Sequence, residues 1–289
     1  MIKDILAEEK AYLAKYNEYV KILQQRSWTM HADKLAELSE IRGISIETLT
    51  EHGVFYIHGY EELMVPEYID RLEKFGLINE LNHMPIFHER WIIPIKDFDG
   101  NIINLVGYSP YIDNRYLYGV AKYYDRKNDM YGMENFREAC ELGWAIYVEG
   151  ITDCLAVRSL GIKNVFASCG TMRSDIKMRH LNQFKYGVIF CADRDKSGQN
   201  TLTHWKTNCC VYMYISIELR LKDIDDYINK NYNIETGQKD VLGPSSSIRM
   251  ERAENLLATI QAAVNWLMHQ GYHEKTIKSD IKYTSITLC

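Results

Sequence analysis

The stretch that decides the fold begins with Trp144-Ala-Ile-Tyr-Val148 and continues directly into Glu149-Gly-Ile-Thr-Asp153. A short apolar run followed by a carboxylate, a glycine and a helical pattern to Leu160 predicts a buried strand that leads into a helix. The pattern returns downstream in strand-like runs at 164–167, 186–191 and 210–215, each followed by a helical segment. Such alternation is typical of a parallel sheet with right-handed crossovers.

Upstream of this region, helical periodicity predicts helices at 1–25, 33–41 and 68–75, and a further helix that Ser45 caps. Two apolar runs, 90–96 and 101–106, flank the turn signal Asp99-Gly100 and predict a β-hairpin, in which Pro94 favours an edge or a bulge. Residues 109–143 have an irregular pattern. Downstream, 243–247 has the composition of a linker, and 249–269 has the pattern of an amphipathic helix.

These elements together predict an α/β protein, α+β overall. A mostly parallel sheet flanked by helices is preceded by a mixed lobe of helices and a β-hairpin and followed by a short helical tail. The predicted divisions are a helical extension at 1–32, the mixed lobe at 33–143, the sheet domain at 144–235, and a linker with a helical segment at 236–289.

Composition limits the function classes. The chain has 289 residues and a net charge of -5, which argues against a generally basic coat while allowing a local basic track. No apolar run approaches the roughly 20 residues that cross a bilayer, and no signal-peptide core follows Met1, so we expect a cytoplasmic protein without a membrane partner. The seven cysteines form no C-x-x-C, so no zinc is expected.

Carboxylates follow three strands of the predicted sheet. Glu149 and Asp153 follow the first strand, Asp193 and Asp195 follow the third, and Asp223, Asp225 and Asp226 follow the fourth. Parallel strands end at the same edge of a sheet, where ligands bind, and clustered carboxylates repel one another unless cations lie among them. Oxygen ligands of this kind suit Mg²⁺ or Mn²⁺. Any one of these acids alone fits a helix cap or a solvated loop equally well.

The ordered set of motifs resembles the Toprim domain, and among Toprim proteins it resembles bacterial DnaG-type primases. The motifs are E149-G-I-T-D153, A167-S-C-G-T171, D193-R-D-K-S-G198 and K222-D-I-D-D-Y227. Upstream, R42-G-I-S45, the hairpin F87-H-E-R-W-I-I-P-I-K-D97, R115-Y-L117 and M130-Y-G132 resemble the rest of the primase catalytic core. The resemblance covers roughly residues 33–230.

The resemblance implies a role for each matching residue. Glu149 would be a catalytic carboxylate and a metal ligand, Asp193 and Asp195 would be catalytic ligands, and Asp223 and Asp225 would be ligands with Asp226 as the rival of Asp225. Asp153 would support the cluster. The residues implied to hold template and nucleotides are Arg42, Arg90, Lys96, Arg115, Lys222 and, for one further family lysine, either Arg126 or Lys127.

The implied function is a DNA primase that uses Mg²⁺ or Mn²⁺ to join nucleoside triphosphates on single-stranded DNA. The family's zinc ribbon has no counterpart in the residues before the core, which favours a truncated phage or mobile-element version. A replicative helicase or a zinc-ribbon protein in trans is the candidate partner for initiation. The alternatives are a Toprim nuclease, which would use the same acids with water as nucleophile, and a non-catalytic replisome-assembly protein.

Overall fold

The computed structural model describes residues 2–79, 84–170, 174–193, 196, 198, 200–201, 204, 212–216, 227, 246–274 and 285–287. The chain divides into two compact units. The first comprises residues 1–40 and 44–125, and the second comprises 41–43 and 126–289. The predicted sheet domain starts at residue 144, where the first strand of the second unit also starts. The main part of the second unit begins earlier, at Arg126.

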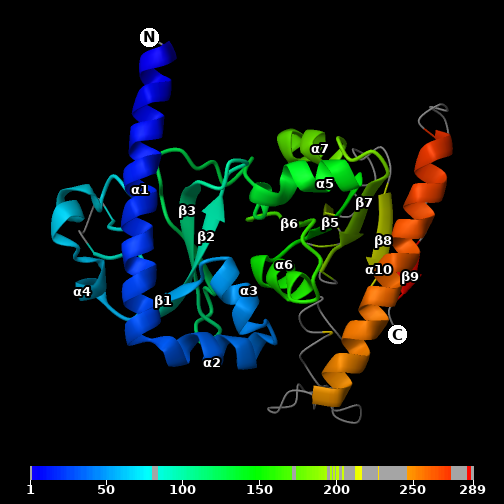
Figure 1. Ribbon diagram of the computed structural model, residues 1–289, viewed down its shortest axis with the longest axis horizontal. Coiled ribbons are helices and arrows are strands. Elements are labelled where there is room, and N and C mark those ends of the chain that lie inside the picture. Colours follow the sequence, from blue (N-terminus) through cyan, green and yellow to red (C-terminus); the bar gives the residue numbers. More distant parts are fainter. Residues whose placement is uncertain are drawn as a thin grey trace. The chain divides into compact units, whose positions relative to one another are not determined.

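The first unit contains an antiparallel sheet with the strand order β1-β2-β3-β4 (Figure 1). The strands are β1 (Phe55–Ile57), β2 (Arg90–Lys96), β3 (Ile102–Tyr108) and β4 (Tyr116–Tyr118). The predicted hairpin is β2–β3, and of the two alternatives for Pro94, an edge or a bulge, the structure has the edge. Pro94 lies in the part of β2 beyond Ile92, which is the last residue that pairs with β1. The register between β2 and β3 shifts one residue further along, between Ile95 and Lys96. The strands β1 and β4 were not predicted.

Helices cover this sheet. They are α1 (Ile2–Met30), α2 (Ala32–Arg42), α3 (Ile46–Glu51) and α4 (Tyr60–Leu63), with the 3₁₀ helix η1 (Pro66–Arg71). Ser45 caps α3 as expected, because its hydroxyl accepts a hydrogen bond of 3.1 Å from the amide of Thr48. The predicted α-helix at 68–75 is wrong in kind and in extent, since a 3₁₀ helix starts two residues earlier, at Pro66, and ends at Arg71, and a turn follows.

The core of the first unit forms between α1 and the sheet. Tyr16, Tyr19 and Val20 of α1 are fully buried and pack with Phe75 and Phe55. The phenol oxygen of Tyr19 also donates to the carbonyl of Leu63 at 2.9 Å. Tyr19 is therefore a packing residue with a hydrogen-bonding end.

The second unit contains a parallel sheet. Its strands are β5 (Trp144–Val148), β6 (Val165–Ala167), β7 (Gly187–Cys191), β8 (Tyr212–Ser216) and β9 (Ser285–Thr287). The order is β6-β5-β7-β8-β9, and every neighbouring pair is parallel. The four predicted strands are present. The tail was predicted to be helical, but it also contributes β9, which pairs with β8.

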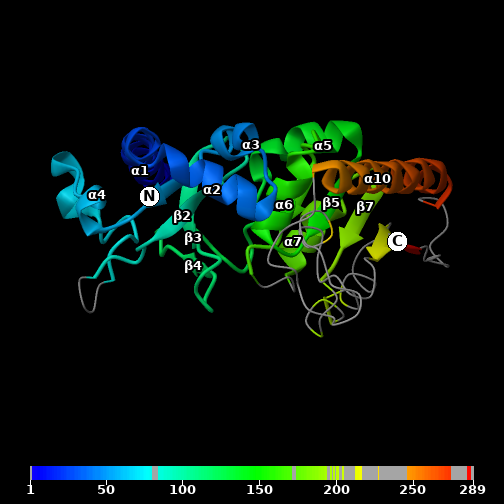
Figure 2. The same ribbon diagram turned by 90° about the horizontal axis from the view of Figure 1, so that it is seen from below.

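Helices flank the parallel sheet. They are α5 (Phe136–Leu142), α6 (Ile151–Arg158), α7 (Asp175–Leu181) and α10 (Ser246–Glu274), with the 3₁₀ helix η2 (Met133–Asn135). The helices α5 and α7 share a core with Tyr147, Phe166 and Phe190 of the strands. Figure 2 shows α10 running beside β7, with which it is in contact. In the part of the chain that the structure describes, no helix has the length and apolar character to span a membrane.

Candidate active site at the carboxyl edge of the parallel sheet

Two predicted site residues meet where β5 and β7 end. Glu149 directly follows β5, and Asp193 lies two residues after β7; these strands are neighbours, with Val148 paired to Cys191. The amide of Asp193 donates a hydrogen bond of 3.1 Å to Oε1 of Glu149. Glu149 is half-buried and Asp193 is 8% exposed. We call Glu149, Asp153 and Asp193 the carboxylate edge.

Steric crowding explains the glycine at position 198, the last residue of the D-x-D-x-x-G motif. A Cβ atom on Gly198 would overlap the backbone carbonyl of Asp193 and would lie 2.8 Å from Oε1 of Glu149. Contacts this short do not occur for real Cβ atoms, so a side chain here would displace the backbone of Asp193. A glycine at position 198 is therefore the residue that fits beside both Asp193 and Glu149.

Asp153 lies close to the same edge. It is in the first turn of α6 and only 6% exposed. Its carboxylate contacts Gly150, where a Cβ atom would overlap Oδ2. Burial raises the pKa of the Cys191 thiol at the end of β7, and the negative charge of Asp153 raises this pKa further. The carboxylate of Asp153 therefore lies against Gly150, just after β5, and its charge raises the pKa of Cys191 at the end of β7.

The donors of the carboxylate edge are of the kind that Mg²⁺ and Mn²⁺ prefer, since Glu149 and Asp193 bring oxygen atoms together from neighbouring strands. The further predicted ligands Asp195, Asp223 and Asp225, with the rival Asp226 and with Lys222, lie outside the described residues. Within the described part of the chain, no group of three His, Cys, Asp or Glu residues is arranged to hold a metal ion. The residues present fit part of a divalent-ion site.

Arg42 contacts the E-G-x-x-D segment. It ends α2, is 9% exposed, and donates from Nη2 to Oγ1 of Thr152 at 2.8 Å. Thr152 lies in the first turn of α6, next to Asp153. Arg42 therefore braces the helix that carries Asp153, a contact that sequence reasoning did not anticipate.

Of the two alternatives for the further basic residue, Arg126 contacts the loop that follows β6. Its Nε donates to the carbonyl of Cys169 at 3.2 Å, in the loop that follows β6. A Cβ atom on Gly170 would lie 2.6 Å from Nε of Arg126, and Gly170 has a φ of +118°. The guanidinium therefore packs against a backbone position that only glycine fits. The side chain of Lys127 is exposed.

The remaining basic candidates belong to the first unit. Arg90 is 6% exposed and donates to the carbonyls of Arg115 at 3.0 Å and Asn114 at 3.1 Å, and burial lowers its pKa. Arg90 thus holds the loop before β4, whereas the side chain of Arg115 is exposed. Lys96 lines a cavity of about 580 Å³ together with Lys21 and Glu18 of α1.

Sequence reasoning missed two buried cations. Lys177 of α7 is 0% exposed, and its amine donates to the carbonyls of Ser168 and Arg126. A signal existed, because Leu181 and Phe184 recur four and seven residues later and place Lys177 on the apolar face of the helix.

Arg158 of α6 is the second buried cation, and it forms a 2.8 Å ion pair with Glu134. It also donates to the carbonyl of Val165 at 2.9 Å. Arg158 therefore ties α6 to η2 and to the start of β6.

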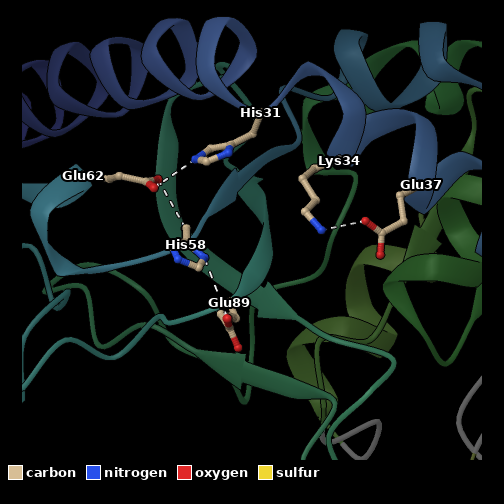
Figure 3. A network of polar contacts seen from close by, with 6 residues as sticks. All are labelled: His31, Lys34, Glu37, His58, Glu62 and Glu89. Atoms are coloured by element: carbon tan, nitrogen blue, oxygen red, sulfur yellow. Dashed lines mark hydrogen bonds and ion pairs between the residues drawn. The ribbon is translucent and has the colours of Figure 1, made fainter.

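Histidines gather with carboxylates in the first unit (Figure 3). Nε2 of His31 lies 2.9 Å from Oε1 of Glu62, whose other oxygen accepts from the amide of His58 at 3.3 Å. Nδ1 of His58 lies 3.7 Å from Oε1 of Glu89. These contacts join Glu62 of α4 to His31, which follows α1, and join His58, which follows β1, to Glu62 and to Glu89, which precedes β2.

Comparison with known proteins agrees with this geometry. Residues 146–228 match a family described as Toprim-like, and this range includes Glu149, Asp153 and Asp193. DNA primase of Clostridium acetobutylicum is 29% identical over 269 residues, which is 84% of this chain and 40% of the relative. DNA primase of Borreliella burgdorferi is 32% identical over 135 residues, 44% of this chain and 25% of the relative. The chain thus spans less than half the length of these relatives.

Solved structures of bacterial primases resemble this chain in fold. A DnaG primase catalytic domain bound to single-stranded DNA superposes with a TM-score of 0.66 at 19% identity, covering 92% of this chain and 84% of that one. The zinc-binding and RNA polymerase domains of Aquifex aeolicus primase give a TM-score of 0.59 at 23% identity, covering 74% of this chain and 58% of that one.

The strand order, the carboxylate edge and the matched segment define a protein with a Toprim domain. Over 92% of this chain the fold is similar to that of a DnaG primase catalytic domain, and the two relatives compared above are bacterial DNA primases. The predicted resemblance and fold class are confirmed.

Proposed function

We propose that this protein is the catalytic core of a DNA primase, which synthesises short RNA primers on single-stranded DNA by divalent-metal-dependent nucleotidyl transfer. The observation that carries the proposal is the contact between Asp193 and Glu149 at the edge of a Toprim sheet. The similarity to a DNA primase over 84% of this chain, well beyond the Toprim segment, also supports it.

The carboxylate edge would hold the divalent ions, with Glu149 and Asp193 as ligands together with Asp195, Asp223 and Asp225. Bound Mg²⁺ or Mn²⁺ lowers the pKa of an attacking hydroxyl and offsets charge on a phosphate. Asp153 supports the edge from α6, where Arg42 fixes the first turn through Thr152. Glu149 accepts a hydrogen bond from the backbone amide of Asp193, so the carboxylate of Glu149 is oriented before a substrate binds.

The reaction joins two nucleotides. The 3′-hydroxyl oxygen of one forms a bond to the α-phosphorus of the next triphosphate, the bond to pyrophosphate breaks, and the hydroxyl proton leaves to solvent or to a neighbouring carboxylate. Arg126, held over Gly170, presents a cation at the loop after β6, and Lys127 and Lys222 would add charge for the triphosphate. Base choice comes from pairing with the template.

The proposed partners follow from this reaction. They are a single-stranded DNA template, nucleoside triphosphates, and a replicative helicase or zinc-ribbon protein that supports initiation in trans. In the first unit, the exposed Arg115 and the half-buried Lys96 are the proposed template contacts, and Arg90 would act by holding the loop that carries Arg115.

The test is synthesis from labelled nucleoside triphosphates on single-stranded templates with Mg²⁺ or Mn²⁺, beside a nuclease assay under the same conditions. Template-dependent oligoribonucleotides that disappear in Asp193→Asn are the expected result. Metal-dependent cleavage of the template without synthesis would identify a Toprim nuclease instead. Template binding without either reaction would identify an assembly protein.

A further inference from the structure

The segment at residues 126–128 is held to the parallel sheet by several polar contacts that converge on one loop and one helix. Arg126 donates through Nε to the carbonyl of Cys169 at 3.2 Å. Oδ1 of Asn128 accepts from the hydroxyl of Ser174 at 2.8 Å, and Ser174 is the N-cap residue of α7. We call residues 126–128 the basic segment.

Lys177 links the basic segment to the loop after β6. Its amine donates to the carbonyl of Arg126 at 3.3 Å and also to the carbonyl of Ser168. Lys177 is fully buried, so its amine is inaccessible to a triphosphate or a template. Burial of a lysine side chain is costly, and hydrogen bonds from its amine to carbonyl groups offset that cost.

The same loop also reaches the carboxylate edge. The hydroxyl of Ser168 lies 3.1 Å from the carbonyl oxygen of Glu149, to which it donates. Lys177 therefore contacts the main chain on both sides, at Arg126 directly and at Glu149 through Ser168. One buried amine thus sets the spacing between the basic segment and the strand end that carries Glu149.

We propose that Lys177 is a positioning residue, which holds the basic segment so that Arg126 presents its guanidinium to the triphosphate beside the carboxylate edge. The positioning role rests on the proposed function, whereas the mechanical link between Lys177 and the basic segment stands without it. The carbonyl that Lys177 holds and the guanidinium that packs on Gly170 belong to the same residue, Arg126, so release of the carbonyl would loosen the contact with Gly170.

The mechanical link is tested by limited trypsin digestion of the full chain. Trypsin cleaves after Arg126 and Lys127, whose side chains are exposed, and cleavage of a native segment follows its local opening. Lys177→Met keeps the length of the buried side chain and removes the amine. We expect cleavage at residues 126–127 to accelerate roughly tenfold, since one anchoring hydrogen bond to a charged donor is lost.

The variant Lys185→Met is the matched control, because Lys185 is an exposed lysine of the same unit whose amine lies over the ring of Tyr186. It should leave cleavage at 126–127 unchanged. Thermal unfolding of each variant separates local from global effects. Lys177→Met leaves the carbonyls of Arg126 and Ser168 without this donor, so some loss of Tm is expected, and cleavage that accelerates more at 126–127 than at the other tryptic sites identifies the link.

The functional arm measures KM and kcat for nucleoside triphosphates with a supplied primer and template. Lys177→Met should raise KM roughly tenfold with a smaller change in kcat, and Lys177→Arg should recover part of the loss because it keeps a cationic donor. A lower Tm with equal acceleration at all tryptic sites would make Lys177 merely structural and overturn the proposal. Faster local cleavage in a protein that never synthesises primers would retain the link and reject the proposed function.

Discussion

The backbone amide of Asp193 donates a 3.1 Å hydrogen bond to Oε1 of Glu149, which couples the residue after β7 to the carboxylate after β5. The two strands pair in parallel along their whole length, from Trp144 with Gly187 to Val148 with Cys191. The separation of the two carboxylate residues is therefore fixed by the sheet itself, and the variants Glu149→Gln and Gly198→Ala test what depends on it.

Glu149→Gln should abolish primer synthesis and leave the fold intact. The amide side chain keeps an oxygen that can accept from Asp193, so the hydrogen bond survives while the negative charge is lost. We expect a decrease in kcat of about 100-fold or more, as for removal of a catalytic carboxylate. Synthesis assays and urea unfolding of the same preparation measure the two effects, and retained synthesis would exclude Glu149 from catalysis.

Gly198→Ala should reduce activity by moving Asp193. The added Cβ would overlap the Asp193 carbonyl, so the backbone must shift, at a cost of about 2 kcal/mol of unfolding free energy. The control is Gly161→Ala, which adds a Cβ with nothing within 4 Å at a residue with φ of +86°. The control should lose stability through backbone strain alone and keep its activity. Equal activity in the two variants would contradict the steric role of Gly198.

Arg158→Met should destabilise the second unit. The side chain of Arg158 is 2% exposed and that of Glu134 is 16% exposed, so removing the guanidinium leaves a largely buried carboxylate without its ion-pair partner. Breaking a buried pair in this way costs about 3 kcal/mol of unfolding free energy. Urea unfolding of the double variant Arg158→Met/Glu134→Leu should recover most of that loss. No recovery would show that the carbonyl contacts of Arg158 dominate.

Stability should fall as pH rises above 9, and Cys154 should account for part of the fall. Burial raises the pKa of the Cys154 thiol from 9.0 to about 12, so the folded chain keeps the thiol proton after the unfolded chain has lost it. The unfolded state then binds fewer protons, which makes unfolding easier by about 1.4 kcal/mol per pH unit between pH 9 and 12. Cys154→Ala should flatten this slope in urea titrations at pH 8 to 10, and an unchanged slope would reject the assignment.

Binding of single-stranded DNA should weaken steeply with salt, with exposed Arg115 as one contributor. Each phosphate contact adds about 0.7 to the log–log slope for a single strand, so Arg115→Ala should flatten the slope by about that amount. Arg90→Ala should instead lower stability, because Arg90 is buried against the carbonyls of residues 114 and 115. Fluorescence anisotropy at several salt concentrations measures the slope, and a slope unaffected by Arg115→Ala would remove it from the interface.

The parallel sheet could be predicted from the sequence because its strands are buried on both faces and read as continuous apolar runs, as in β5 and β7. The strand β9 could not be predicted, because three residues, Ser285–Thr287, join the sheet by pairing with β8 across a long stretch of chain. The strand β1 is equally short, and its position depends on pairing with β2 rather than on any local pattern.

The candidate site shows the same division between local motif and long-range contact. The motifs place Glu149 and Asp193 at strand ends, and parallel pairing then brings them together. The motifs do not indicate which of their side chains are buried. Arg42 and Arg90 match family positions, yet both are largely buried and donate to groups of this chain. The role of Lys177 depends on the loop after β6 and on the basic segment, which are far apart in sequence.

The most direct test of the central claim is synthesis of the first dinucleotide from unlabelled and labelled nucleoside triphosphates on a defined single-stranded template, measured against Mg²⁺ or Mn²⁺ concentration. The account predicts a template-dependent dinucleotide in the wild type that vanishes on chelation and in both Glu149→Gln and Asp193→Asn, while the two variants remain folded. If the wild type forms no dinucleotide and extends no supplied primer, with or without a helicase or zinc-ribbon protein, then the carboxylate edge does not carry nucleotidyl transfer.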